Sequence, residues 1–277
     1  MPIRYPLPPV IGIEVYTNDV VVLRGPGYPN KVDNTRSDIT EFSKASRQRL
    51  AFVAANSDVT FTSMLTLTYP REFPNDGRDV KRNLNHFLVM LRKKVSSLEY
   101  LWFLEFQRRG APHIHILVRG ARVSRAMQHW TSETWYRICA TGDVRHLAAG
   151  TRLERIKKPN GARNYAVKYA HKMKQKCVPP NYRNVGRFWG CTRAVKPTIK
   201  SEHDCTGDDL IGALAAGGWH WMKDDTVCFK TLYGASKALT EWVSRGMLEL
   251  STSDQKRATL HTTQEERRDG YEIVSDV

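Results

Sequence analysis

The sequence lacks the features that define several classes of protein. None of its 277 residues lies in an apolar run near the roughly 18 residues of a membrane span, and residues 1–10 lack the basic-then-apolar pattern of a secretory signal. The five cysteines form no CxxC pair, and their odd number and irregular spacing do not suggest a disulfide framework. We therefore expect a soluble, cytoplasmic protein in a reducing compartment, with no membrane partner.

Familiar zinc and nucleotide-binding patterns are also missing. Cys177, Cys191, His203 and Cys205 could in principle bind zinc, but their spacings match no familiar zinc site. The phosphate-loop pattern GxxxxGK[ST] does not occur. We therefore do not expect the chain to unwind a nucleic-acid duplex by itself.

Acidic residues are scarce and unevenly placed. The chain has 43 Lys and Arg against 28 Asp and Glu, a net charge of +15, which favours a polyanionic partner. Residues 201–277 are acidic, with 8 cations and 14 acids, whereas residues 151–200 hold 14 cations and one acid, Glu154. Aromatic residues interleaved with those cations would suit phosphates and stacked bases, unless this is only a solvated basic face. They are Tyr165, Tyr169, Tyr182, Phe188 and Trp189.

The hydrophobic pattern predicts an α+β fold with a central antiparallel β-sheet and flanking helices. Strands are expected at residues 62–69, 100–107, 113–118 and 151–157, with RRGAP turning the middle pair into a hairpin. Helices are expected at 37–55 and 79–94, capped by Ser37 and Asp79, and at 122–139 and 160–176. Alternating strands and helices of this order favour helices packed on a sheet.

The same pattern predicts three parts of the chain. Residues 1–45 form an N-terminal arm or strands, with apolar runs at 11–16 and 20–23. Residues 46–200 form the main domain, which holds both groups of candidate chemical residues. Residues 201–277 form an acidic, mostly helical C-terminal appendage, because LIGALAA and TLYGASKALTEWVSRG have a helical pattern.

A pair of histidines is the first candidate for chemistry. His113 and His115 are two apart in a predicted strand, so their imidazoles project from the same face and could ligate one metal ion. Glu105 and Gln107 share the alternating face of the preceding strand, and a carboxylate there could complete a three-ligand site. The alternative is that both histidines are half-exposed strand residues with no ligand.

A pair of tyrosines is the second candidate. Tyr165 and Tyr169 are four apart in the predicted basic helix, and each is followed three residues later by a lysine, Lys168 or Lys172. Nearby lysines favour the phenolate and help to hold a phosphodiester, so a tyrosine could attack phosphorus. The alternative is that the tyrosines anchor the helix to the sheet and the lysines face solvent.

Three segments together resemble the motifs of the HUH endonucleases. MLTLTYP (64–70), GAPHIHILV (110–118) and NYAVKYAHK (164–172) occur in the order of that family's motifs, and GRFWG (186–190) follows them. The chain resembles most the rolling-circle replication initiators of phages and plasmids. Its two-tyrosine motif is similar to that of the gene A proteins of small single-stranded DNA phages, and the gene 2 proteins of filamentous phages are related in activity.

The resemblance implies a role for each candidate residue. His113 and His115 match the metal-binding pair, with Glu105 as third ligand and Gln107 as the fallback. Tyr165 and Tyr169 match the paired nucleophiles, with Lys168 and Lys172 beside them. The expected cofactor is Mg²⁺ or Mn²⁺, which would make the scissile phosphate more electrophilic. Attack by one tyrosine would leave a 5′-phosphotyrosyl strand and a free 3′-OH.

The resemblance also implies partners and competing functions. The expected partner is single-stranded DNA at a replication origin in the cytoplasm of a bacterial host cell, with host helicase and DNA polymerase acting in trans. Conjugative relaxases and single-strand transposases share the chemistry, but the doubled YxxK motif argues against both. A function of another class is noncatalytic DNA binding with structural histidines, which predicts no covalent adduct.

Overall fold

The computed structural model of the protein describes residues 10–23, 39–157, 165, 177–206, 220–222, 231–232 and 272–274. The chain divides into two compact units. One consists of residues 35–196, and the other of residues 1–34 together with residues 197–277. Among the described residues, no helix combines the length and the apolar character needed to cross a bilayer.

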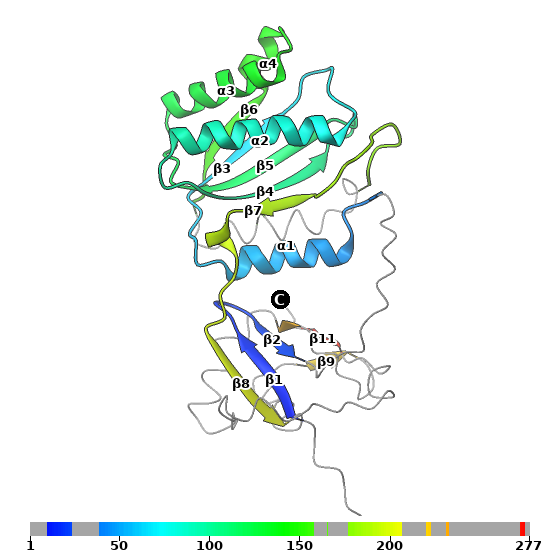
Figure 1. Ribbon diagram of the computed structural model, residues 1–277, viewed down its shortest axis with the longest axis vertical. Coiled ribbons are helices and arrows are strands. Elements are labelled where there is room, and N and C mark those ends of the chain that lie inside the picture. The colour runs from blue at the N-terminus through cyan, green and yellow to red at the C-terminus, as the bar shows by residue number, and fades with distance from the viewer. Residues whose placement is uncertain are drawn as a thin grey trace, which may run out of the picture. The chain divides into compact units, whose positions relative to one another are not determined.

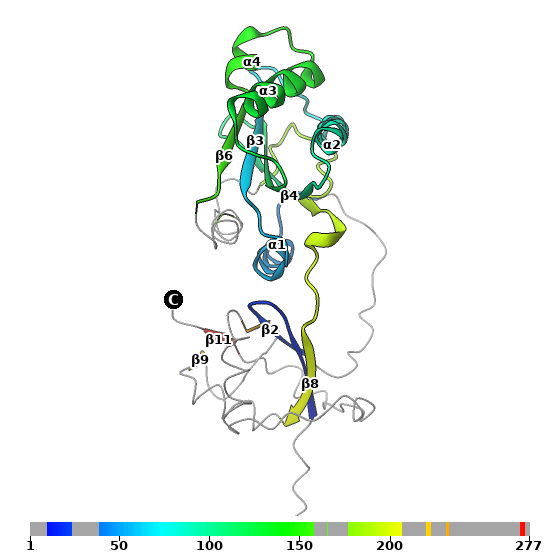
Figure 2. The same cartoon turned by 90° about the vertical axis from the view of Figure 1, so that its left-hand side faces the viewer.

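The unit of residues 35–196 is built on a five-stranded antiparallel sheet with the order β6-β3-β5-β4-β7. Helices α2 and α3 cover one face of this sheet and α1 lies on the other (Figures 1 and 2). The expected α+β class with an antiparallel sheet and flanking helices is therefore confirmed. The strands are β3 (Ser63–Thr68), β4 (Glu99–Phe106), β5 (Pro112–Arg119), β6 (Thr151–Arg155) and β7 (Trp189–Cys191).

The helices of this unit begin at polar caps. They are α1 (Lys44–Asn56), α2 (Gly77–Lys94), α3 (Arg125–Cys139) and the short α4 (Val144–Ala149). Asp76 caps α2 by accepting a hydrogen bond from the Arg78 amide at 2.8 Å, and Ser43 caps α1. The predicted caps were therefore wrong: the first turn of α2 contains Asp79, and residues 39–43 precede α1 without being helical.

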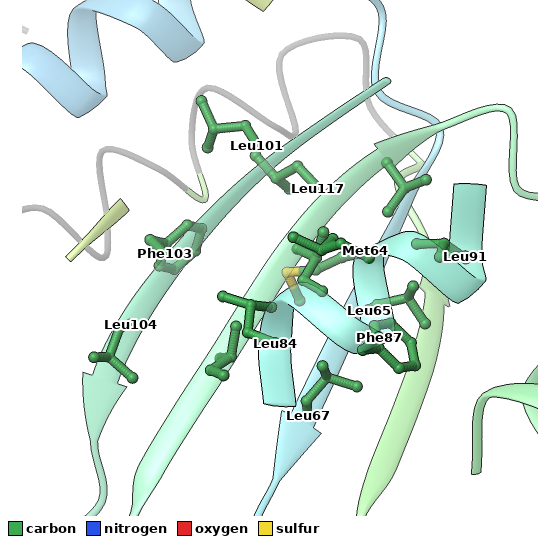
Figure 3. Close-up of a cluster of buried hydrophobic side chains, with 14 of the residues drawn as sticks. Met64, Leu65, Leu67, Leu84, Phe87, Leu91, Leu101, Phe103, Leu104 and Leu117 are labelled. Atoms are coloured by element: carbon green, nitrogen blue, oxygen red, sulfur yellow. The ribbon is translucent and has the colours of Figure 1, made fainter. Parts of the chain in front are cut away.

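The core of the unit forms where α2 packs on the sheet. Leu84, Phe87 and Leu91 follow the helical repeat, and they lie over Leu65 and Leu67 of β3 (Figure 3). All five side chains are at most 2% exposed. Trp135 of α3 is also fully buried, and its ring meets Phe87 edge to face. The helices are thus fixed to the sheet by a continuous apolar layer.

The segment after residue 177 adds an edge strand and a hydrogen bond to α1. Trp189 pairs with Phe103 at the start of β7, and the indole Nε1 of Trp189 donates to Ser46 Oγ of α1 at 3.1 Å. Tyr182 and Phe188 are buried in the core, in contact with Phe106. These two aromatic residues are therefore part of the packing, which corrects the expectation that they stack on bases.

The other unit contains a four-stranded antiparallel sheet with the order β10-β2-β1-β8. Its strands are β1 (Val10–Val15), β2 (Val20–Leu23), β8 (Ser201–Thr206) and β10 (Thr231–Leu232). A separate pair is formed by β9 (His220–Met222) and β11 (Glu272–Val274). LIGALAA lies outside the described residues, and in TLYGASKALTEWVSRG the described residues, Thr231–Leu232, are a strand. The division into 1–45, 46–200 and 201–277 stays a prediction.

Candidate functional site

The two predicted histidines lie side by side on one face of the sheet. His113 and His115 alternate with the buried Ile114 in β5, so both rings project from the face opposite to α2. Their ring centroids are 4.6 Å apart at an interplanar angle of 82°. His115 is 4% exposed, whereas His113 is half-buried. The strand period thus places two imidazoles within reach of one ligand.

Strand β3 supplies a hydroxyl to each imidazole. Thr66 is opposite His115 in the register and Thr68 is opposite His113. Thr66 Oγ1 lies 3.3 Å from His115 Nδ1, and Thr68 Oγ1 lies 3.0 Å from His113 Nδ1. Both contacts are to the Nδ1 side of the ring, so β3 holds the orientation of both imidazoles.

Strand β4 supplies a buried carboxylate and an aromatic support. Glu105 is opposite His113 in the register, and its Oε2 lies 3.4 Å from His115 Nε2. Glu105 is also buried, and Phe103 stacks on the His115 ring with centroids 5.1 Å apart. Of the three residues predicted to bind a metal, Glu105 thus lies against His115, and His115 lies against His113.

Gln107 belongs to the surroundings of His113. Its Nε2 lies 3.3 Å from His113 Nδ1, and its Oε1 accepts a hydrogen bond from Arg109 Nε at 3.0 Å. Arg109 also donates to the backbone carbonyls of Tyr69 and Pro70, which ties the hairpin loop to the end of β3. In this orientation, the side-chain NH₂ of Gln107 faces His113, and its carbonyl oxygen faces Arg109.

The donor set suits a divalent ion in chemistry, though it is not fully assembled. Two imidazoles and a carboxylate are mixed ligands of the kind that bind Mn²⁺. Neighbouring donors around an octahedral ion at about 2.1 Å lie roughly 3 Å apart, close to the 3.4 Å between His115 Nε2 and Glu105 Oε2. In the described part of the chain, however, no group of three His, Cys, Asp or Glu side chains is arranged to hold a metal.

A cation that the sequence analysis did not single out lies on the same face. Arg152 of β6 is opposite Thr66 in the register, so one row across the sheet runs Arg152, Thr66, His115. The Arg152 side chain is 74% exposed, and its Nη2 lies 2.7 Å from Glu154 Oε1. The period of two in TRLER predicts that Arg152 and Glu154 share a strand face, but the sequence does not show that this strand pairs with β3.

The structure describes one of the four predicted nucleophile-motif residues. Tyr165 is helical, half-buried and packed against the hydrophobic core. Tyr169, Lys168 and Lys172 lie outside the described residues. Burial raises the pKa of Tyr69, whose hydroxyl accepts a hydrogen bond from Asn83 Nδ2. Tyr69 is therefore an unsuitable nucleophile although it adjoins the strand with the threonines.

The fold and site together define an α+β protein with a histidine-bearing face on an antiparallel sheet. Residues 62–174 match the model of a family described as replication-associated protein ORF2/G2P. The match covers about two-fifths of the chain, and it includes β3, both histidines, Glu105 and the two tyrosines. It indicates a replication-associated protein, a rolling-circle initiator. No curated protein and no solved structure matches the chain.

Proposed function

We propose that the protein is a metal-dependent endonuclease of the HUH type that nicks and rejoins single-stranded DNA at a replication origin. The observation that carries this proposal is the meeting of His113, His115 and Glu105 on one sheet face, within the segment that matches the replication-associated family. A bound Mg²⁺ or Mn²⁺ would neutralise charge on the scissile phosphate and make phosphorus more electrophilic.

The chain's own residues would carry out the strand transfer. The phenolate of Tyr165 or Tyr169 forms a bond to phosphorus, and the bond from phosphorus to the 3′ oxygen breaks. The product is a 5′-phosphotyrosyl strand, and the departing oxygen takes up a proton to become a free 3′-OH. Because the new ester keeps the bond energy, rejoining needs no ATP. A host polymerase would extend the free 3′ end, and a host helicase would act in trans in the cytoplasm.

The lysines and Arg152 would hold the substrate. Lys168 and Lys172 would favour the phenolate, and Arg152 offers an exposed guanidinium in the same cross-strand row as His115. A second tyrosine allows cutting of the regenerated site while the first is still esterified. Two tyrosine nucleophiles would therefore suit repeated rounds of rolling-circle replication.

A covalent adduct tests this function directly. The full chain is incubated with single-stranded circular DNA and Mn²⁺, denatured in detergent, and analysed for DNA attached to protein. We expect an adduct that a chelator prevents and that Tyr165→Phe with Tyr169→Phe abolishes. An adduct that persists in the double variant would contradict the tyrosine mechanism.

A noncatalytic DNA-binding function is the second candidate. It is favoured by the burial of His115, whose ring is already held by Thr66, Phe103 and Glu105. His113→Ala separates the two functions. If His113 is a ligand, cleavage is lost, DNA affinity stays within a few fold and the protein stays folded. If the histidines are structural, the variant loses stability and the wild type forms no adduct even with origin DNA.

A further inference from the structure

A polar pocket lies beyond the end of β5 that is opposite to His113 and His115. It has a volume of about 360 Å³, at the low end of the range of ligand sites. Its walls come from the end of α2, the loop before β4, the loop after β5 and the start of α3. His113 is near the first residue of β5 and the pocket begins after the last, so about 20 Å of strand separates them.

The pocket is lined by cations and hydroxyls. Lys94 and Arg122 contribute the charge, and Ser96, Ser97 and Ser124 contribute hydroxyl groups. Arg, Lys and Ser side chains are the groups that contact phosphate oxygens in nucleic-acid complexes. Neither cation forms an ion pair with another residue that the structure describes. The lining thus has the chemistry of an anion site.

The two loops that form the pocket are in tight contact. Gly120 has φ +98°, and a Cβ at that position would lie 2.8 Å from the carbonyl oxygen of Ser97. The absence of a side chain at Gly120 therefore lets the loop after β5 pack against the loop before β4. Lys94 precedes one of these loops and Arg122 lies in the other, so the contact fixes the two backbones relative to each other.

Helix stabilisation explains some of the local charge but not all of it. Arg92, Lys93 and Lys94 are in the last turn of α2, where cations complement the helix dipole. Arg125 is the first residue of α3, where a cation opposes the dipole, and the first turn has no acid to offset it. Arg122 lies outside both helices. A bound anion would account for Arg122, which lines the pocket.

We propose that this pocket binds a backbone phosphate of DNA, outside the segment held on the histidine face. The proposal takes DNA as ligand from the proposed function. The pocket's single-sign charge and its three hydroxyls suit a phosphodiester, and no base-sized aromatic residue lines it. It would therefore contribute affinity and register rather than sequence preference.

The test is the salt dependence of DNA binding by the full chain. Tyr165→Phe and Tyr169→Phe are introduced and chelator is added, so that no cleavage occurs. The anisotropy of a fluorescein-labelled strand of mixed sequence, and of its duplex, measures DNA binding by two proteins. One carries both Lys94→Gln and Arg122→Gln and is called the pocket variant, and the other keeps Lys94 and Arg122. At low salt, we expect the Kd of the pocket variant for DNA to be several-fold higher than that of the protein with Lys94 and Arg122. The slope of log Kd against log salt should fall by about 0.7 per lost contact for the strand or 0.9 for the duplex.

A matched control removes the same charge elsewhere. Arg137→Gln and Arg145→Gln change exposed arginines at the far end of α3 and in α4. We expect a clearly smaller change than for the pocket variant. A larger loss for the strand or for the duplex identifies the form of DNA that the pocket holds. Equal effects of the two variants, or no effect of the pocket variant, would overturn the proposal.

The outcome is independent of strand cleavage. If no adduct forms in any protein, the nicking mechanism fails while the pocket result stands. If the adduct forms and the pocket variant binds DNA like the control, the pocket proposal alone fails.

Discussion

Thr66 and Thr68 determine how the imidazoles can be used. Each hydroxyl contacts the Nδ1 atom of its imidazole, so a metal ion would have to be bound through Nε2. Such outer contacts are typically worth 10-fold to 100-fold in metal affinity. The threonines are therefore positioning residues, since they act through the histidines.

We expect Thr68→Val to weaken Mn²⁺ binding by at least about 10-fold, because His113 loses a partner that fixes its ring. Thr68→Ser should restore binding, since the hydroxyl is retained. Free Mn²⁺ measured by electron paramagnetic resonance gives the affinity without relying on cleavage. Ser63→Ala, on the opposite face of β3, serves as control. Unchanged Mn²⁺ affinity in Thr68→Val would show that the hydroxyl does not position a ligand.

Lys81 is a buried cation that the proposed mechanism does not use. Its Nζ lies 4.9 Å from the centre of the Trp102 ring and has no hydrogen-bond partner among the described residues. Burial lowers the pKa of Lys81 to about 8, from 10.5. The folded state therefore binds fewer protons than the unfolded state between these two values, so stability rises with pH across that window.

We expect Lys81→Met to stabilise the protein at neutral pH by up to about 3 kcal/mol, the cost of the pKa shift. Between about pH 8 and 10, the free energy of unfolding should rise less in Lys81→Met than in the wild type. Urea unfolding at several pH values measures both effects. Lys93→Met removes an exposed lysine from the same helix and should reproduce neither. Parallel pH curves for wild type and Lys81→Met would contradict the assignment.

Helix α2 depends on a close contact at its first residue. A Cβ on Gly77 would lie 2.2 Å from the backbone oxygen of Asn184, and the Gly77 amide donates to Arg183 O at 2.7 Å. Asn184 Nδ2 in turn donates to the cap residue Asp76 at 2.9 Å. The segment after residue 177 is thus joined to the start of α2 by backbone and side-chain contacts.

We predict that Gly77→Ala destabilises the protein by roughly 2 kcal/mol or more, because the methyl group would collide with backbone that is itself hydrogen-bonded. The neighbouring Arg78→Ala removes an exposed side chain and should change stability by less than about 0.5 kcal/mol. Chemical denaturation compares the two. A Gly77→Ala variant as stable as Arg78→Ala would mean that the contact can relax without cost.

The elements that the sequence predicted well are those with strong internal periodicity. β3, β4, β5 and α2 were each found within two residues, because the strands are nearly continuous runs of buried residues and α2 has one buried face. The caps were missed because Ser37 and Asp79 have the right chemistry, and only the tertiary structure decides where a helix begins. β7 and α4 were not predicted at all, since three and six residues carry too little pattern.

The candidate site was predictable where it follows the two-residue period of a strand. Alternation along one strand predicts that His113 and His115 share a face. A single hairpin turn then places Glu105 beside them. The supporting contacts could not be predicted in this way, because the pairing of Thr66 with Arg152 depends on β6, which is far away in sequence. Sequence spacing alone also could not show that Tyr182 and Phe188 are buried.

At the scale of the whole molecule, charge is separated between the two units. Residues 35–196 carry 31 Lys and Arg against 11 Asp and Glu, whereas residues 1–34 and 197–277 together carry 12 against 17. The acidic unit could limit nonspecific DNA binding by competing for the basic one, or it could recruit a helicase. These roles predict different behaviour of the basic unit alone.

We expect a fragment of residues 35–196 to fold, because its hydrophobic core lies entirely within these bounds. If the acidic unit competes with DNA, the fragment binds strands of mixed sequence several-fold more tightly than the full chain at low salt. The difference should shrink as salt screens the charges. Anisotropy titrations measure both. Equal affinities at low salt would exclude competition and favour recruitment.

The pairing of β1 with β8 has a consequence for folding during translation. Val15 is opposite Ser201, so β1 is completed by a strand that is synthesised about 190 residues later. At about 5–20 residues per second, β1 leaves the ribosome roughly 10 to 40 s before its partner. Residues 35–196 are synthesised as one continuous stretch during that interval. A chain that ends before residue 201 would hold the whole basic unit joined to a β1–β2 hairpin that lacks both β8 and β10, and the two open edges would be a template for aggregation.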